Sequence, residues 1–346
     1  MTRRDVAVAG ATGLVGQTLL ELLDGHPWFR AAELLASDRS AGRRYGEAVD
    51  WRLPGGPPAG VAGLRVRGAG ADVRSRTIFS CLPSDVASER EIRWVSRGHD
   101  VFTNAGSHRM HLGVPLLVPE VNEDHCAVLR DRPGEWEGRL VANPNCSVSG
   151  LALALAPLVR RWPSPRVHAT TLQAASGAGL AGLDSAEIPD NVLPHIPGEE
   201  EKLRTEPRKL LGRFREGRWR EADVEVVAAC HRVPVRHGHV LSLVIEGEEA
   251  MTPGAAREAW EDFRGSTAVR RLPSAPGRPV RVHRDPDRPQ PSLDRDEDRG
   301  MAVHVGRIRG RPGRVACTAL VHNLVRGAAG AALLNAEYAR AVRSDV

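Results

Sequence analysis

A cysteine near the middle of the chain has the clearest capacity for chemistry. Cys146 ends the segment Asn143-Pro144-Asn145-Cys146, which separates a short apolar run from a leucine-rich, helix-like stretch. We therefore expect Cys146 at a helix N-terminus, where the helix dipole stabilises a thiolate and lowers the pKa of the thiol. A thiolate can attack an aldehyde to give a thiohemiacetal, which becomes a thioester when its hydride passes to a nicotinamide. Backbone N–H groups at the start of the helix would stabilise the oxyanion.

The other four cysteines give no sign of chemistry. Each lies in or near an apolar run, as expected for a small buried side chain, and their spacing matches no disulfide or zinc framework. We predict reduced thiols, a cytoplasmic protein and no bound metal. These cysteines are Cys81, Cys126, Cys230 and Cys317.

A base is needed beside the nucleophile, and one short segment holds three histidines. His239 is the preferred candidate because it follows Gly238, and a glycine lets a backbone and a substrate come close. Arg232, seven residues earlier, could clamp a carboxylate through a bidentate contact. From the residues alone, His231 and His237 remain competing candidates for the base.

The first expected strand, Val6 to Ala9, leads directly into a glycine-rich turn and a helix-like stretch. Glycines in this setting allow a tight turn and let backbone N–H groups approach a pyrophosphate at the helix N-terminus. The strand–turn–helix order favours a bound dinucleotide over a turn without a ligand. The residues predicted to bind the cofactor here are Gly10, Thr12, Gly13, Leu14, Val15 and Gly16.

The end of the second expected strand distinguishes NADP from NAD. Ser37, Arg39 and Ser40 offer two hydroxyls and a forked cation that could hold a 2′-phosphate. An NAD enzyme places an acidic residue here to bind the ribose diol, and Asp38 keeps that alternative open. The sequence favours NADP.

The pattern of elements changes near residue 145. Residues 1–145 alternate short apolar strands with helix-like stretches, which predicts an α/β domain with a Rossmann-type doubly wound parallel sheet. Residues 146–322 begin with a helix and continue with longer strands, which is typical of an α+β domain with a mixed or antiparallel sheet. A C-terminal helical segment, 323–346, is expected to complete the first domain. Strands are expected at 6–9, 33–37, 77–81, 100–103, 140–142, 167–173, 224–230, 240–246, 303–308 and 315–321, and a long loop at 274–298.

The net charge of +5 over 346 residues does not indicate a nucleic-acid surface. Arginines are spread among acidic residues along the whole chain, and only Lys202 and Lys209 are lysines among the 48 basic residues. A surface that follows phosphates would cluster its charge and mix both residue types. No apolar run reaches the roughly 20 residues of a membrane helix. We expect neither nucleic acid nor membrane among the partners.

Taken together, these segments resemble the aspartate-semialdehyde dehydrogenase family, in its archaeal and fungal branch. The resemblance covers nearly the whole chain and is highly specific to the superfamily, though less so to one substrate. The motifs that carry it are GATGLVGQ, SDRSAGRRYG, CLPSDVA, NAGSHRM, VPEVN, NPNCS, LQAASGAG, DNVLPHIPGEEEK, HRVPVRHGH, PQPSLDRD and HNLVRGAAGAALLNAE.

The resemblance implies roles for the polar residues of these motifs. Cys146 would be the nucleophile, and His239 the acid–base group. Gln173 would orient the substrate beside the nucleophile. Arg232 would bind the α-carboxylate of the substrate, and Glu199 its amine.

The resemblance also implies a phosphate site, the rest of the cofactor site and an oligomer. Lys202, one helical turn after Glu199, and Arg109 would bind phosphate. The chain would form a homodimer or a homotetramer through its second domain, the catalytic and dimerisation domain. The further residues implied to bind the cofactor are Ser84, Ser176, Gly177 and Asn323.

Four sites depart from the family pattern. Val240-Leu241 replace a polar pair after the histidine, and Ser292 replaces an arginine. Arg299 replaces a small residue or asparagine, and His231 replaces an asparagine. We expect all four sites near the substrate or the nicotinamide, where they would leave the thioester chemistry intact and alter the choice of acyl group.

We predict the reversible, NADPH-dependent conversion of 4-aspartyl phosphate to aspartate semialdehyde through a thioester on Cys146. The alternative is a paralogous reductase with another acyl donor, such as malonyl-CoA reductase or a secondary-metabolic semialdehyde dehydrogenase. N-acetyl-glutamyl-phosphate reductase is disfavoured, because it typically carries Asn-Pro-Gly-Cys where this chain has Asn-Pro-Asn-Cys. The alternative of another class is an inactive NADP-binding sensor or interaction protein.

Overall fold

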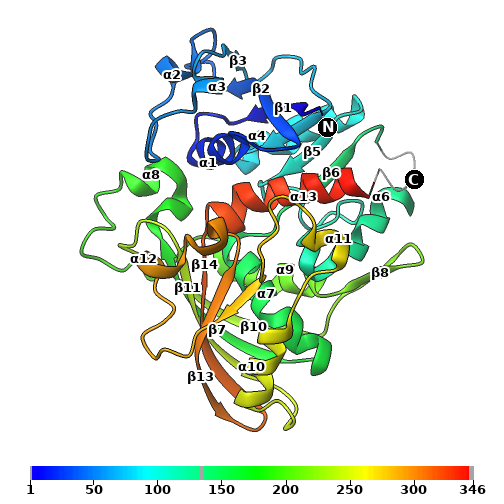
Figure 1. Ribbon diagram of the computed structural model, residues 1–346, viewed down its shortest axis with the longest axis vertical. Coiled ribbons are helices and arrows are strands. Elements are labelled where there is room, and N and C mark those ends of the chain that lie inside the picture. Colours follow the sequence, from blue (N-terminus) through cyan, green and yellow to red (C-terminus); the bar gives the residue numbers. More distant parts are fainter. Residues whose placement is uncertain (1, 132–135, 343–346) are drawn as a thin grey trace.

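The computed structural model describes residues 2–131 and 136–342, which build two sheets on a common core (Figure 1). The first sheet contains the strands β1 (Arg4–Ala9), β2 (Phe29–Ala36), β3 (Val66–Gly68), β4 (Thr77–Ser80), β5 (Asp100–Thr103) and β6 (Arg139–Ala142). All of them are parallel, in the order β3-β2-β1-β4-β5-β6. The chain changes direction across the sheet between β1 and β4, and open α/β sheets bind ligands at such a switch point.

The second sheet is mixed. It contains the strands β7 (Arg166–Ala174), β10 (Glu225–Val233), β11 (His239–Glu246), β12 (Val280–Val282), β13 (Val303–Arg311) and β14 (Arg314–Val321). Their order is β10-β7-β11-β14-β13-β12, with antiparallel central pairs and a parallel pair at each edge. A separate hairpin pairs β8 (Arg213–Arg215) with β9 (Arg218–Arg220). Buried and exposed residues alternate along β7, so one face of this sheet packs while the other stays open.

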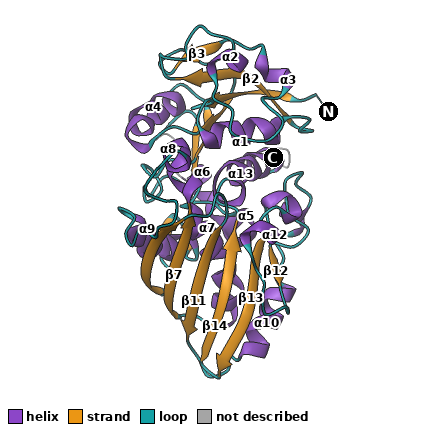
Figure 2. Ribbon diagram, turned by 90° about the vertical axis from the view of Figure 1, so that its left-hand side faces the viewer, coloured by secondary structure: helices purple, strands orange, loops and turns teal. Residues whose placement is uncertain are grey.

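Helices cover the sheets. The α-helices are α1 (Leu14–Leu23), α2 (Tyr45–Ala48), α3 (Ala59–Ala62), α4 (Ser84–Ser96), α5 (Pro119–Asn122), α6 (Val128–Asp131), α7 (Cys146–Arg161), α8 (Gly179–Leu183), α9 (Glu199–Leu210), α10 (Pro253–Asp262), α11 (Thr267–Arg270), α12 (Pro291–Asp294) and α13 (Gly330–Ala341). In Figure 2, α7 and α10 lie behind the second sheet, whose front is bare. Over residues 2–131 and 136–342, no helix combines the length and the apolarity that crossing a membrane requires.

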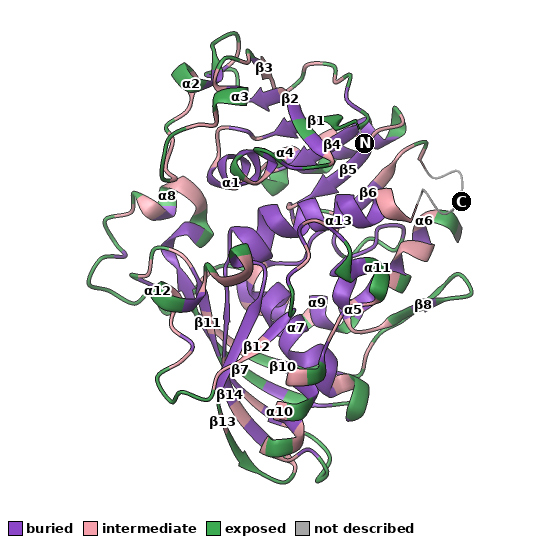
Figure 3. Cartoon of the chain, viewed as in Figure 1, coloured by how far each residue is buried: buried purple, intermediate pink, exposed green. Residues whose placement is uncertain are grey.

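Helix α7 joins the two sheets into one core. Its residues from Ser147 to Leu158 are all buried, and its apolar side chains belong to one hydrophobic cluster with Ile78 of β4 and Leu241 of β11. Helix α13 is buried from Gly330 to Ala339 and covers the other face of the first sheet (Figure 3). The nucleophile of the predicted chemistry is therefore the first residue of the helix that links both halves of the molecule.

The predicted fold class is confirmed by the sheet order, and each of the ten expected strands is present. The expectation of a plain loop at 274–298 is wrong, because β12 and α12 interrupt it. Val280 and Val282 are too few to signal a strand on their own, and it is pairing with β13 that makes them one. The C-terminal helix also begins differently, with a π-helical turn over Val325–Ala329.

An ion pair ties this π-helical turn to the first half of the chain. Both nitrogens at the end of the Arg326 guanidinium donate to the Glu120 carboxylate at 2.8 Å, and each side chain is about 1% exposed. Glu120 lies in α5, and a 3-10 helix (Glu123–Ala127) and α6 separate it from β6, the strand that leads to Cys146. A buried charge without its partner is strongly destabilising, even where a complete buried pair adds little.

Glu120→Gln should therefore lower the free energy of unfolding by about 3–5 kcal/mol, because it leaves the guanidinium charge buried and unpaired. Chemical denaturation monitored by circular dichroism gives the value. Glu89→Gln is the matched control, since it breaks the exposed pair with Arg93 and should change stability by less than about 1 kcal/mol. Equal effects of the two substitutions would contradict a structural role for the buried pair.

Candidate active site

The turn before α7 places the nucleophile. Asn145 caps the helix, because its Oδ1 accepts the backbone N–H groups of Ser147 at 2.9 Å and Val148 at 3.3 Å. An asparagine at this position satisfies N–H groups that would otherwise lack a partner. The sulfur of Cys146 then lies 3.2 Å from Nε2 of His239, at the start of β11.

His239 is held in one orientation by the backbone. It is fully buried, and its Nδ1 accepts the N–H of Ala174 at 2.9 Å. A neutral imidazole whose Nδ1 accepts carries its proton on Nε2, so that proton points at the sulfur. Of the three candidate histidines, the structure brings His239 to Cys146. His237 instead stacks on His322, with ring centroids 6.0 Å apart.

The resting charge state of this pair differs from expectation. Burial, followed by the charge of Glu199, raises the pKa of Cys146 to about 12, although Arg109 and Arg232 oppose this. The prediction of a lowered thiol pKa is thus wrong for the free protein, because burial outweighs the helix dipole. Burial, followed by Arg232, lowers the pKa of His239 to about 3. The pair rests as a thiol beside a neutral imidazole.

One cavity of about 290 Å³ collects most of the predicted site residues. It lies between the two sheets, below the switch point of the first, and Cys146 opens into it. The predicted site residues that line it are Val15, Ser84, Arg109, Cys146, Gln173, Ser176, Gly177, Glu199, Lys202, Arg232 and Asn323. The other predicted cofactor residues lie outside its lining, in the turn before α1 and after β2: Gly10, Thr12, Gly13, Leu14, Gly16, Ser37, Arg39 and Ser40.

A carboxylate on α9 organises one wall of the cavity. Glu199 accepts from Nε2 of Gln173 at 3.0 Å, from Nδ2 of Asn145 at 2.9 Å and from Nζ of Lys202 at 2.8 Å. Burial alone would raise the pKa of Glu199, but Lys202 and these hydrogen bonds bring it below its usual value. The site therefore holds a fixed negative charge close to the sulfur.

Two glycines make room for the reacting groups. A Cβ on Gly177 would lie 2.5 Å from Nη1 of Arg232 and 3.0 Å from the His239 ring. A Cβ on Gly327 would lie 2.7 Å from the Cβ of Cys146. Real side chains do not tolerate such distances, so a larger residue at either position would displace the guanidinium, the imidazole or the nucleophile.

The turn before α1 fits a dinucleotide diphosphate. Gly10 has φ +78° and lies so close to β4 that a Cβ would be 2.4 Å from the carbonyl oxygen of Cys81. Helix α1 has no capping side chain and no acidic residue in its first turn. Its first N–H groups therefore remain available to an anion. Asn323 and Ser176, joined at 2.9 Å, line the cavity at Cys146 from the other half of the chain.

The segment after β2 presents groups that suit a 2′-phosphate. Ser37 and Arg39 are exposed, and Ser40 is buried beside them. Asp38 is exposed as well. A hydroxyl and an accessible guanidinium are ligands that a phosphate takes, so the residues fit NADP.

None of the residues that depart from the family pattern lines the cavity, and for His231 and Val240 the expectation of a position near the substrate is wrong. His231 and Val240 directly flank Arg232 and His239 in strands, so their side chains point to the opposite face of the sheet. Leu241 is buried in the core.

The other two departures lie in the segment after β12. Ser292 belongs to α12. Arg299 lines a second cavity of about 290 Å³, beside His26 and Ser274. Neither residue lines the cavity around Cys146, so their expected influence on the acyl group stays a prediction.

The sequence reasoning missed three residues that support the site. Asn145 fixes the start of α7, as described above, and the preference of asparagine for helix N-caps was the available signal. Glu206 and Lys209 of α9 are buried and face the loop that carries Arg109. The signal for Lys209 was its rarity, because it is one of only two lysines in an arginine-rich chain.

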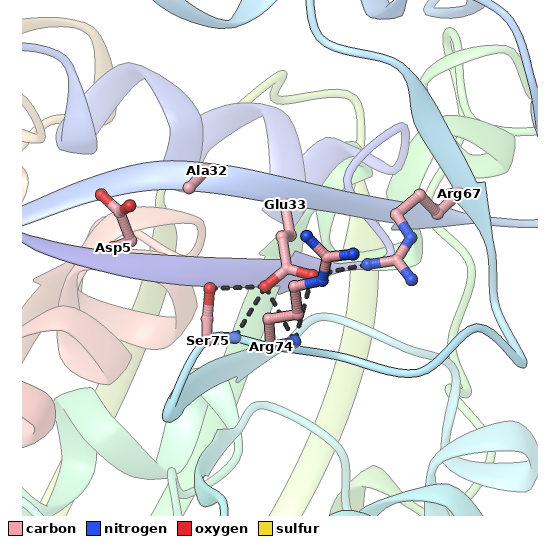
Figure 4. A pocket seen from close by; sticks show the side chains of 6 residues that line it. All are labelled: Asp5, Ala32, Glu33, Arg67, Arg74 and Ser75. Carbon is pink, nitrogen blue, oxygen red and sulfur yellow. Dashed lines mark hydrogen bonds and ion pairs between the residues drawn. The ribbon is translucent and has the colours of Figure 1, made fainter.

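A larger cavity, of about 560 Å³, lies at the edge of the first sheet (Figure 4). The charged side chains that line it are those of Asp5, Glu33, Arg67 and Arg74. The carboxylate of Glu33 accepts from the backbone and hydroxyl of Ser75, the backbone of Arg74 and the guanidinium of Arg67. These contacts engage the carboxylate of Glu33 and secure the loop that carries Arg74 and Ser75.

A cluster of possible metal ligands also lies outside the site. His283, Asp294 and His304 bring their ligand atoms within 4.8 Å of one another. The carboxylate of Asp294 is already ion-paired with Arg288 and accepts the N–H of Gln290 at 2.6 Å. A carboxylate so engaged is committed to holding the segment between β12 and α12.

Comparison with known proteins gives a consistent result. Residues 5–129 match the family described as semialdehyde dehydrogenase, NAD binding domain, and residues 155–326 match semialdehyde dehydrogenase, dimerisation domain. The aspartate-semialdehyde dehydrogenase of Archaeoglobus fulgidus is 42% identical over 344 residues, which are 97% of each chain. The malonyl CoA reductase (NADP) of Metallosphaera sedula is 34% identical over 96% of this chain and 95% of the other.

A solved structure agrees with these sequence relatives. The crystal structure of aspartate semialdehyde dehydrogenase with NADP from Candida albicans matches with a TM-score of 0.89 at 35% identity, covering 98% of this chain and 99% of the other. Sequence and fold thus agree over nearly the whole length. The chain belongs to the semialdehyde dehydrogenase family, alongside these archaeal and fungal aspartate-semialdehyde dehydrogenases.

Proposed function

We propose that the chain is an NADP-dependent aspartate-semialdehyde dehydrogenase, which interconverts 4-aspartyl phosphate and aspartate semialdehyde. The observation that carries the proposal is the 3.2 Å contact between Sγ of Cys146 and Nε2 of His239. Cys146 opens into a cavity that is also lined by Arg109, Glu199, Lys202 and Arg232.

The cavity offers complementary charges for an amino acid. Arg232 would bind the α-carboxylate, and Glu199 the ammonium group. Because the charge of Glu199 raises the thiol pKa, a substrate ammonium that neutralises this charge would favour the thiolate. The proposed substrate thus helps to ionise the nucleophile that attacks it.

His239 would act as a hydrogen-bond donor in the acyl step. Two of the backbone donors at the start of α7 are occupied, since the N–H groups of Ser147 and Val148 donate to Asn145. The Nε2–H of His239 is aimed at the sulfur and can hydrogen-bond to the thiolate once the thiol proton has left to solvent. It can then hydrogen-bond to the thiohemiacetal oxygen, whose own proton must leave to solvent as the hydride is transferred. A second proton on Nδ1 would face the N–H of Ala174, so imidazolium is disfavoured.

The remaining residues would position the cofactor and the second nucleophile. When bound, NADP accepts the hydride of the thiohemiacetal. The N-terminus of α1 would hold its diphosphate, and Arg39 its 2′-phosphate. Lys202 and Arg109 would then hold phosphate for attack on the thioester of Cys146.

We also propose that the chain works as a homodimer or homotetramer in the cytoplasm. The match of residues 155–326 to a dimerisation domain supports an oligomer. The bare face of the second sheet carries the exposed apolar residues Leu172 and Val227, 39% and 51% exposed, which a second copy would cover. The five cysteines are free, as in a reducing compartment.

Replacing the nucleophile should have a different effect from weakening the carboxylate clamp. We expect Cys146→Ala to lower kcat by about 10⁴-fold or more, because a covalent step is lost. Arg232→Lys should mainly raise KM for the semialdehyde, by about 10- to 100-fold, since a point charge replaces a forked donor. Steady-state assays of NADPH absorbance measure both, and substantial turnover by Cys146→Ala would end the covalent proposal.

The high thiol pKa predicts an unusual alkylation profile. Iodoacetamide should label Cys146 about tenfold faster for each pH unit from 6 to 9, without a plateau, because only the thiolate reacts and the pKa is about 12. Glu199→Gln removes a charge that raises this pKa, so it should speed labelling at pH 7. Mass spectrometry of the Cys146 peptide provides the rates, with Glu201→Gln as control. A plateau near pH 7, or slower labelling of Glu199→Gln, would contradict the charge state described.

The acyl acceptor separates the proposed function from its alternatives. With aspartate semialdehyde and NADP, turnover should require phosphate or arsenate, and CoA should not replace them. Retention of Glu199, Lys202 and Arg109 in one cavity supports this choice. Dependence on CoA would instead indicate a malonyl-CoA reductase. Cofactor binding without turnover on either acceptor would indicate an inactive sensor.

A further inference from the structure

Helix α9 carries a second buried acidic and basic pair below the one that lines the cavity. Glu206 and Lys209 are about 3% and 4% exposed and lie one turn apart on the helix face that looks toward Arg109. Neither lines the cavity. Their hydrogen bonds reach the loop of Arg109, on the proposed phosphate side, and Asn145, which precedes the nucleophile. These two parts of the site must come together when phosphate attacks the thioester.

Glu206 bridges Arg109 and the turn before the nucleophile. Its Oε1 accepts from Nη1 of Arg109 at 2.9 Å. Its Oε2 accepts the backbone N–H of Asn145 at 2.7 Å. A single carboxylate thus fixes the distance between a guanidinium in the cavity wall and the residue that precedes Cys146.

Lys209 holds the same loop by its backbone. Its Nζ donates to the carbonyl oxygens of Arg109, His111 and Val114 at 2.7–2.8 Å. Three acceptors around one nitrogen match the three hydrogens of an ammonium group. No single nitrogen of a planar guanidinium can donate in three divergent directions. This accounts for a lysine here, although only two of the 48 basic residues are lysines.

The guanidinium of Arg109 is fixed at two of its three nitrogens. Nη1 donates to Glu206, and Nη2 donates to the carbonyl of Asn104 at 2.8 Å. Its Nε is buried without a hydrogen-bond partner among the residues that the structure describes. Arg109 therefore lines the cavity with a fixed orientation.

We propose that Glu206 and Lys209 are positioning residues that hold Arg109 for binding the attacking phosphate at a set distance from the Cys146 thioester. The inference rests on the proposed function, because it assigns Arg109 to phosphate. It makes α9 a common support for both halves of the site. Glu199 and Lys202 face the substrate, and the turns below them fix the phosphate side.

The test uses Glu206→Gln. A glutamine can still accept the N–H of Asn145 with its oxygen, but it then turns an NH₂ group toward the guanidinium, where two donors repel each other. Arg109 should lose its orientation while the nucleophile turn remains. We expect KM for phosphate to rise at least about tenfold, and the burst of NADPH formed in single turnover without phosphate to keep its rate.

Two further variants isolate the effect. Glu201→Gln on the same helix breaks only the exposed pair with Arg204 and should leave KM for phosphate unchanged. In an Arg109→Gln background, Glu206→Gln should change KM for phosphate by less than about a further twofold, because the effects of substituting residues that act as one unit do not add. A full further rise in that background would overturn the proposal.

The outcomes distinguish the positioning role from the proposed function on which it rests. If the unmodified protein gives no phosphate-independent burst, the proposed function fails. If it gives the burst and Glu206→Gln leaves KM for phosphate unchanged, only the positioning role fails. Thermal melting checks each variant, and if Glu206→Gln is unfolded, Glu206→Asp decides. Its shorter carboxylate keeps the charge but cannot reach both Arg109 and Asn145, so the same rise in KM is expected and its absence refutes the role.

Discussion

The geometry of the site depends on one asparagine whose polar groups are all engaged. The backbone N–H of Asn145 binds Glu206, its amide nitrogen binds Glu199, and its amide oxygen caps α7. Because the cap sets where the helix begins, it also sets where the sulfur of Cys146 meets the imidazole of His239. Both carboxylates come from α9, so a single helix fixes the residue that precedes the nucleophile.

The same arrangement sets a conflict between holding the nucleophile and ionising it. A carboxylate close enough to bind Asn145 is also close enough to oppose a thiolate. Arg109 and Arg232 act in the other direction, but burial and Glu199 prevail. Reactivity in such a site therefore depends on a change of the charge around the sulfur. The proposed partner of the substrate ammonium group, Glu199, carries part of this charge. One side chain would then both keep the free thiol protonated and recognise the substrate.

Much of this could be predicted from sequence, and the failures have physical causes. Alternating strands and helices predicted the first sheet, and Asn-Pro-Asn before Cys146 predicted a helix start, because both signals are local. The direction of the thiol pKa shift could not be predicted, since it depends on burial and on Glu199, which reaches the sulfur only through tertiary packing. The error over His231 and Val240 was avoidable, because neighbours of an inward-facing strand residue must face outward.

The C-terminal segment gives the molecule an order of assembly. Gly327 lies against Cys146, Arg326 neutralises Glu120, and α13 covers an apolar face of a sheet built from the first 142 residues. On a ribosome these covering residues emerge after nearly everything they cover. One face of the first sheet therefore stays uncovered until α13 has been synthesised. A chain cut short before residue 322 keeps its cysteine but lacks the wall that shapes the pocket around it, so a truncated product has no formed site with which to capture aldehydes.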